Sequence, residues 1–312
     1  MPLLLHRNRL TSRASRTVCS VAFFVLAATL SQKATPQTAA ALSVKFQGSI
    51  VQESRKLEDY LIERPKPRGI DVLCGLKHFA IITYAVPAER FQGIFPERFQ
   101  LDTVEVNGQK MGLLSVVPFI DVDFTSAVFP FPKFTMGQTN YRIYIIDKET
   151  GERCVWFLGT TLDSWTLAVP RYLWNLPWHS GKVSFECVLD ETSGFYEKYR
   201  METVSDWAAA SVELVQSKYD KFDFPGFPDV ESALVYLTHP LAGFYYRRDS
   251  KLGTYRVWHK ELEVTPAKLV SASFKLLSDL EIVKKSEQNS PYSVLIEPIN
   301  EFTIYLPPTV IR

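Results

Sequence analysis

The sequence lacks the short motifs that mark nucleotide-dependent or metal-dependent catalysis. It contains no Gly-x-Gly-x-x-Gly, Walker loop, Gly-x-Ser-x-Gly elbow, His-Glu-x-x-His or Cys-x-x-Cys. Such motifs hold phosphates, a nucleophilic serine or a metal ion at fixed backbone positions. We therefore expect neither a metal site nor a cofactor.

Cysteine is scarce as well. The chain has four cysteines, at positions 19, 74, 154 and 187, and they are widely spaced. This spacing fits neither a disulfide scaffold nor a zinc site. The net charge of +1 comes from scattered basic residues, so the chain offers no electrostatic footprint for nucleic acid.

Acidic residues are absent before Glu53, while arginine, serine, threonine and alanine are frequent there. Residues 18–30 form an uncharged apolar run, which has the length of a signal-peptide core and is short for a membrane span. We expect residues 1–42 to be a targeting segment of the signal or transit type. It would direct the protein to a plastid, a mitochondrion or the secretory route, or remain as a membrane anchor.

The remaining chain has ordinary globular composition, with 46% hydrophobic and 22% charged residues over the whole sequence. Residues 43–75 are interpreted as a linker with a short helix. No Gly/Ser-rich or charge-rich linker follows residue 75, so residues 76–312 are predicted to form one domain.

Most of this domain is predicted to be strand. The candidate strands are rich in β-branched and aromatic residues and are bounded by Gly, Pro, Asn or Asp. The pattern predicts an α+β fold that is predominantly antiparallel β. The predicted strands are residues 78–85, 111–119, 140–147, 153–158, 181–188, 255–259, 292–296 and 301–306.

Helices are expected at four places. Residues 53–63 have apolar side chains at helical spacing, and residues 87–94 and 229–238 begin with a proline and a capping Asp respectively. The clearest signal is Thr265-Pro266 followed by an apolar stripe, which predicts a helix over residues 265–280.

The least ordinary segment is Asp163–Lys182, which contains three tryptophans and a tyrosine within fifteen residues. These aromatic side chains either plug the end of a barrel or wall a ligand pocket. In the second interpretation Trp174 and Trp178 line the pocket, and Arg171, His179 and Lys182 supply its polar groups.

The segment also carries a family resemblance. Residues 167–180 resemble the hallmark motif of acetoacetate decarboxylase, with Arg171, Trp174 and Pro177 retained. The Pro87 segment, the strand Asn140-Tyr141-Arg142-Ile143-Tyr144 and the C-terminal part from His259 extend the likeness over residues 76–308. The chain is thus similar to the uncharacterised, domain-of-unknown-function branch of the acetoacetate decarboxylase-like superfamily. The resemblance implies a β-barrel with a few peripheral helices.

The same comparison argues against ordinary acetoacetate decarboxylation. In the decarboxylase, one of two adjacent lysines forms a Schiff base with the substrate ketone. The resemblance places Trp178 and His179 at those two positions, and Gln138 where a pocket glutamate is expected. Trp178 has no amine that can form an imine.

A relocated lysine is the alternative. Strand alternation places Lys182 and Glu186 on one face of residues 181–188. If this face turned inward, Lys182 would be the nucleophile and Glu186 an acid or base. Otherwise the two side chains are an exposed pair, which is the usual fate of Lys and Glu.

The strand over residues 140–147 offers a binding face. Asn140, Arg142 and Tyr144 alternate onto one side, with Gln138 preceding them. Arg142 would hold a ligand carboxylate in a bidentate fork and share one cavity with Arg171, or else pin neighbouring loop carbonyls. His179 and His259 titrate near neutral pH and are candidate acid/base groups or structural hydrogen bonders.

The leading hypothesis is a barrel that binds a small, largely apolar organic acid, ketone, or isoprenoid- or polyketide-like intermediate. It would act without a cofactor, as a lyase or isomerase, through His179, His259 or Glu186. The alternatives are a non-catalytic carrier and a decarboxylase with its lysine moved to Lys182. A homo-oligomer is open in each case.

Overall fold

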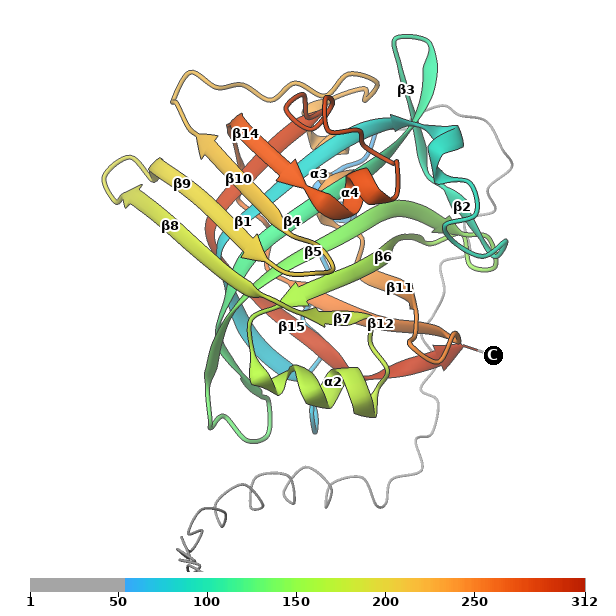
Figure 1. Ribbon diagram of the computed structural model, residues 1–312, viewed down its shortest axis with the longest axis vertical. Helices are drawn as coiled ribbons and strands as arrows, with labels where there is room; N and C mark the ends of the chain where they lie inside the picture. The colour runs from blue at the N-terminus through green and yellow to red at the C-terminus, as the bar shows by residue number, and fades with distance from the viewer. Residues whose placement is uncertain (1–53, 312) are drawn as a thin grey trace, which may run out of the picture. The chain divides into compact units, whose positions relative to one another are not determined.

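The computed structural model describes residues 54–311, which lie within one compact unit. Seven long strands close into a barrel because β5 pairs with both β4 and β6 (Figure 1). All neighbours are antiparallel except β6 and β11. In ring order the strands are β5 (Phe134–Asp147), β4 (Gln109–Ser126), β1 (Val72–Pro87), β15 (Ser293–Ile311), β12 (Leu252–His259), β11 (Ala242–Tyr246) and β6 (Arg153–Leu162).

Short strands extend this barrel. β3 pairs with β4, β2 with β5, β7 with β6 in parallel, and β13 with β15. Their bounds are β2 (Phe99–Leu101), β3 (Thr103–Val106), β7 (Trp178–Ser180) and β13 (Thr265–Pro266).

A second, four-stranded antiparallel sheet lies outside the barrel, in front of β1, β4 and β5 in Figure 1. Its order is β14 (Lys268–Phe274), β10 (Ala210–Val215), β9 (Phe195–Val204) and β8 (Lys182–Asp190). Tyr141 and Val116 belong to the same buried cluster as Tyr199 and Met201 of this sheet. One face of the barrel wall is therefore covered by the outer sheet.

The opposite face of the same strands turns into the barrel. Because side chains alternate along a strand, Gln138, Asn140 and Arg142 point away from the outer sheet. Their partners across β4, such as Phe119 and Ser115, point the same way. Phe119 belongs to a second buried cluster that also contains Leu237. This face forms the barrel interior.

Helices are few and short in the described residues. They are α2 (Ala168–Leu173), α3 (Val230–Thr238) and α4 (Lys275–Asp279), with 3-10 turns η1 (Leu57–Asp59), η2 (Ala88–Phe91) and η3 (Trp165–Leu167). Asp229 caps α3 by accepting a hydrogen bond from the backbone of Ser232. None of these helices has the length and apolarity needed to cross a bilayer.

The strand predictions and the fold class are confirmed. Each predicted strand overlaps an observed one, and the chain forms a largely antiparallel β-barrel with few helices. The helix predicted over 229–238 is α3, and the one over 87–94 is reduced to the 3-10 turn η2.

The helix predicted over 265–280 is wrong for most of its length. Residues 268–274 form strand β14, and only residues 275–279 are helical. Pairing with β14 satisfies the backbone groups of β10 that would otherwise form a free edge. A Val- and Ser-containing segment accepts strand geometry readily, so the tertiary pairing overrides the apolar spacing.

The helix predicted over 53–63 is also largely absent from the described part, where only η1 forms. The backbone N–H groups of Arg55 and Leu57 donate to the side chains of Ser232 and Glu231. The segment is therefore tied to the start of α3 instead of bonding within itself. The predicted targeting segment, residues 1–42, lies outside the described residues.

Candidate functional site

The predicted binding face is assembled inside the barrel. Gln138 Nε2 donates to Asn140 Oδ1 at 2.9 Å, and Thr160 Oγ1 donates to the same oxygen at 2.7 Å. Arg142 and Tyr144 follow on the same side of β5. The structure thus brings together Gln138, Asn140, Arg142 and Tyr144, as the alternation predicted.

Arg142 contacts the end of α3. Its Nη2 donates to the carbonyl oxygen of Leu237 at 2.8 Å, and the Tyr144 hydroxyl donates to the same oxygen at 3.0 Å. A cation beside a helix C-terminus is stabilised by the helix dipole. The buried Nε of Arg142 has no hydrogen-bond partner, and Arg142 forms no ion pair within residues 54–311.

Asp121 is an interior acid that the sequence analysis did not select. It lies on β4, on the same face as Phe119, and only 2% of its surface is exposed. Burial raises the pKa of Asp121 to about 7, against a smaller opposing effect of a hydrogen bond with Cys74. Its Oδ2 atom has no partner. The available signal was one carboxylate in phase with the apolar residues of a strand.

The charges of both Arg142 and Asp121 act on Tyr255 of β12. Its ring stacks on Phe157, with centroids 5.6 Å apart and an interplanar angle of 14°. Burial raises the pKa of Tyr255, and Tyr245 raises it further; the charge of Arg142 opposes this, and Asp121 adds a smaller rise. Both charged side chains therefore act on the same hydroxyl from within the barrel.

His259 is buried, and each of its ring nitrogens lies beside a backbone carbonyl oxygen. Its Nε2 lies 3.0 Å from the carbonyl oxygen of Thr238, and its Nδ1 lies 2.8 Å from that of Lys260. Burial lowers the pKa of His259, although both carbonyl contacts oppose the shift. With both ring nitrogens occupied, the geometry favours the structural interpretation of His259 over an acid/base role.

Trp178 and His179 lie on opposite faces of β7. Trp178 pairs with Thr160 and packs against the cluster of Met136, Leu162 and Leu167 at the α2 end of the barrel. It therefore faces the interior.

His179 faces the other way and stacks on Trp207, with centroids 3.9 Å apart and an interplanar angle of 8°. Burial, with the nearby charge of Arg171, lowers the pKa of His179 to about 4.

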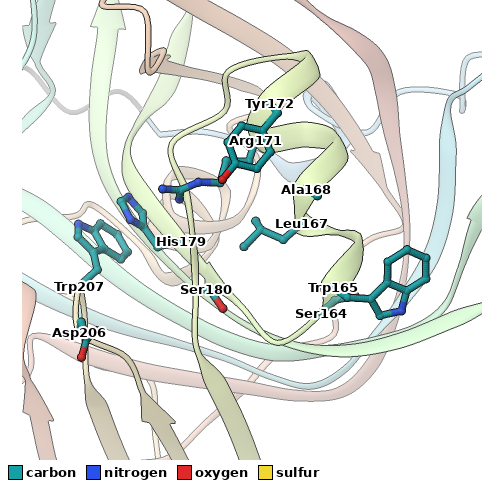
Figure 2. A pocket seen from close by; sticks show the side chains of 10 residues that line it. All are labelled: Ser164, Trp165, Leu167, Ala168, Arg171, Tyr172, His179, Ser180, Asp206 and Trp207. Atoms are coloured by element: carbon teal, nitrogen blue, oxygen red, sulfur yellow. The ribbon is translucent and has the colours of Figure 1, made fainter. Parts of the chain in front are cut away.

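A separate open pocket of about 480 Å³ lies outside the barrel beside α2. Figure 2 shows Arg171, His179 and Trp207 on one side of it, with Trp165 pointing away on the other. Arg171 Nη1 donates to the carbonyl oxygen of Trp178. This pocket brings together two predicted site residues, Arg171 and His179.

The expectation of a single cavity for both arginines is therefore corrected. Arg142 contacts Leu237 at the end of α3, whereas Arg171 lines the pocket beside α2, which Arg142 does not line. Trp174 is half-buried at the end of α2 and does not line the outer pocket. The two predicted groups of site residues are separated because side chains alternate along β7, the strand that follows α2, so that only every second residue faces inward.

Of the two orientations left open for Lys182 and Glu186, the structure shows the exposed pair and not the inward one. Both are exposed on β8 of the outer sheet. Glu186 forms an ion pair there with Lys198, whose Nζ lies 2.7 Å from Glu186 Oε2. Val183, on the other face of β8, is the residue that is buried. Every lysine within residues 54–311 is exposed, so none of them is positioned as a desolvated Schiff-base amine.

Within residues 54–311 no three His, Cys, Asp or Glu side chains gather in a geometry that would hold a metal ion. The polar groups of the interior are instead a guanidinium, a protonatable carboxyl, a phenol and amides. This set suits hydrogen bonding to an organic molecule.

Comparison with solved structures finds similar folds. An acetoacetate decarboxylase from Legionella pneumophila subsp. pneumophila is 16% identical, with a TM-score of 0.48, covering 86% of this chain and 98% of that one. An acetoacetate decarboxylase-like enzyme from Sphingomonas wittichii is 12% identical, with a TM-score of 0.49 and coverage of 80% and 94%.

A third similar structure is the enduracididine biosynthesis enzyme MppR complexed with pyruvate, at 10% identity, a TM-score of 0.44 and coverage of 77% and 89%. No curated relative matches the sequence.

The chain forms a closed β-barrel with an outer sheet and polar groups in its interior. It belongs to the family DUF2071, described as an uncharacterized conserved protein, whose sequence model matches residues 74–298. The predicted domain-of-unknown-function branch is confirmed.

Proposed function

We propose that the protein binds a small organic acid inside the barrel, with the ligand carboxylate at Arg142. The observation that carries this proposal is the buried, unpartnered Nε of a guanidinium that has no ion-pair partner in the described chain. Burying a charge without a counter-charge is costly. A bound carboxylate would supply the missing charge and accept from the guanidinium fork.

The surroundings of Arg142 favour a ligand with an apolar body. Phe157 is the strand partner of Arg142 on β6 and stacks on Tyr255. Both rings are half-buried, which leaves part of their surface available for contact. On the β4 side, Asp121 lies six positions from Ser115, the partner of Arg142, which is about 20 Å along a strand. An elongated molecule fits this spacing better than a compact one.

Asp121 is the interior group best suited to move a proton. A carboxyl with a pKa of about 7 populates both protonation states at neutral pH, as a general acid or base requires. We therefore propose acid/base chemistry without a cofactor, at Asp121 and not at His179, His259 or Glu186. A carrier that returns its ligand unchanged is the alternative outcome.

The binding proposal is tested with the full-length protein purified from its own source. Native mass spectrometry should detect an acidic small molecule on the wild type and on Arg256→Gln, an exposed arginine on β12. Arg142→Gln should lose it. In parallel, a panel of medium-chain carboxylic and 2-oxo acids should raise the Tm of the wild type and not that of Arg142→Gln.

Retention of the same molecule by Arg142→Gln, or equal stabilisation of both proteins by the acids, would contradict the proposal. Conversion of the retained acid by wild type but not by Asp121→Asn would support catalysis. Equal amounts of unchanged acid with both proteins would instead identify a carrier.

A further inference from the structure

Gln138 and Asn140 form a small amide network on the interior face of β5. Gln138 Nε2 donates to Asn140 Oδ1 at 2.9 Å, and Thr160 Oγ1 of β6 donates to the same oxygen at 2.7 Å. Thr160 is the strand partner of Asn140, so the register of β5 and β6 brings their side chains together. The proposed function uses Arg142, the next residue on this face, and gives the amide network no role.

The network leaves one donor group and one acceptor unused. Within residues 54–311, no protein group accepts a hydrogen bond from Asn140 Nδ2, and none donates to Gln138 Oε1. Turning both amides over exchanges their roles, because Asn140 Nδ2 would then donate to Gln138 Oε1 and Thr160 Oγ1. Asn140 Oδ1 and Gln138 Nε2 would be the unused atoms. In either orientation the pair therefore offers one amide N–H donor and one amide carbonyl acceptor.

The unused amide groups lie among apolar side chains. Gln138 is 9% exposed, and strand pairing places it between Phe119 of β4 and Leu162 of β6, which are 4% and 1% exposed. A buried amide group without a partner costs free energy, because it has lost its hydrogen bonds to water. The network therefore suits a ligand group that accepts one hydrogen bond and donates another.

We infer that Gln138 and Asn140 bind the hydroxyl group of a hydroxy acid whose carboxylate lies at Arg142. A hydroxyl accepts from an N–H and donates to a carbonyl through a single oxygen atom. Arg142 follows Asn140 by two residues on the same face of β5, which is about 7 Å along the strand. One small molecule can therefore reach both positions. The inference rests on the proposed binding of an acid at Arg142, and it adds the class of that acid.

A carboxamide is the competing ligand group. It also presents a donor and an acceptor, but it does so with three heavy atoms instead of one. Phe119 and Leu162 flank Gln138, and the buried cluster that contains Leu162 also includes Met136 and Leu167. These apolar side chains favour the smaller group beside Gln138, which is why the network is assigned to a hydroxyl.

The test compares acids that differ by a single polar group. Isothermal titration of the full-length protein uses hexanoate, its forms with a hydroxyl on the third or the terminal carbon, and its terminal carboxamide form. We expect at least one hydroxy form to bind the wild type about tenfold more tightly than hexanoate. The reason is that hexanoate displaces water from the amide groups of Gln138 and Asn140 without replacing its hydrogen bonds. This ratio needs no variant.

Three variants locate the hydroxyl site. Asn140→Leu and Gln138→Leu should each abolish most of the preference for the hydroxy acid while still binding hexanoate, since each removes one partner of the hydroxyl. Thr139→Val is the matched control. Thr139 lies between the two amides in sequence, but its hydroxyl contacts that of Thr203 in the outer sheet, on the opposite face of β5. This variant should keep the preference. Circular dichroism checks that each variant is folded.

Equal affinities of the wild type for hexanoate and both hydroxy forms would overturn the inference. If Arg142→Gln then lost that binding, the proposed function would stand without it. Tighter binding of the carboxamide than of either hydroxy form would assign the network to a carboxamide instead. An equal loss of preference in Thr139→Val and Asn140→Leu would also contradict the inference. Absence of binding by every acid would overturn the proposed function and the inference together.

Discussion

Arg142 and Leu237 join the barrel wall to the end of α3. The guanidinium of Arg142 donates to the carbonyl oxygen of Leu237, and the hydroxyl of Tyr144 approaches the same oxygen. The last carbonyl oxygens of a helix accept no hydrogen bond from a backbone N–H of that helix. These two donors therefore replace the hydrogen bond that the helix cannot make, and they orient Arg142 in the interior.

This arrangement predicts coupled effects on stability. In Arg142→Met or Tyr144→Phe, Leu237 retains one donor, so each single loss should be modest. The double variant leaves the buried carbonyl without a partner, and its loss should exceed the sum of the single losses by about 1 kcal/mol. Urea unfolding of the four proteins measures this coupling. Arg142 Nη2 also donates to the Tyr144 hydroxyl at 3.3 Å. A double loss equal to or smaller than the sum would contradict the prediction and show that this direct bond outweighs the shared carbonyl.

Asp121 gives the second prediction, on pH. Its pKa is raised from 3.8 to about 7, so between these values the unfolded chain releases a proton that the folded protein keeps. Its contribution to stability is thus complete below pH 3.8 and is lost as pH rises toward 7. Asp121→Asn removes this loss. The free energy of unfolding of Asp121→Asn minus that of the wild type should therefore rise by up to about 3 kcal/mol between pH 5 and pH 8.

Asp123→Asn is the matched control, because Asp123 lies on the same strand with its carboxylate exposed beside Lys133. Urea unfolding at pH 5 and pH 8 should show a smaller change for this variant. If the advantage of Asp121→Asn were the same at both pH values, Asp121 would not be the interior proton-binding group.

Gly159 supports the third prediction. It has a φ of +154°, and an added Cβ would lie 2.7 Å from the Trp207 ring and 2.9 Å from the carbonyl oxygen of Pro177. Gly159→Ala should therefore disturb the His179–Trp207 stack and destabilise the fold. Gly93 also has a positive φ but faces open space. The loss for Gly159→Ala should exceed that for Gly93→Ala by about 2 kcal/mol, and equal losses in urea unfolding would contradict the crowding.

The fold was largely predictable because strand signals are local. Alternation also placed Asn140, Arg142 and Tyr144 on one face, where the structure has them. What alternation cannot state is which face turns inward. On β5 the predicted face is the interior one, whereas on β8 the face of Lys182 and Glu186 is the exposed one. That difference depends on the packing of two sheets.

Asp121 and Tyr255 were missed for a related reason. Each lies in a strand that holds other polar residues as well, so nothing local singles it out, and its significance appears only when distant strands close the ring. The segment 265–280 shows the converse problem. Its helical spacing is real in the sequence, but the backbone groups of β10 need a partner strand, which a local pattern does not reveal.

The last prediction concerns imine chemistry. Incubation of the protein with acetoacetate and borohydride should leave it without a covalent adduct, because reduction traps only an imine formed by an amine of lowered pKa. Trp178 faces the interior at the position that the resemblance assigns to the Schiff-base lysine, and every lysine in residues 54–311 is exposed. An acetoacetate decarboxylase treated in parallel shows that the reagents work. A stoichiometric adduct found by mass spectrometry would contradict this prediction. Its mapping to Lys182 would establish that lysine as a relocated nucleophile, although it is exposed on the outer sheet. Absence of the adduct is compatible with ligand binding alone and with the proposed imine-free reaction, in which Arg142 would hold the acid and Asp121 would transfer the proton.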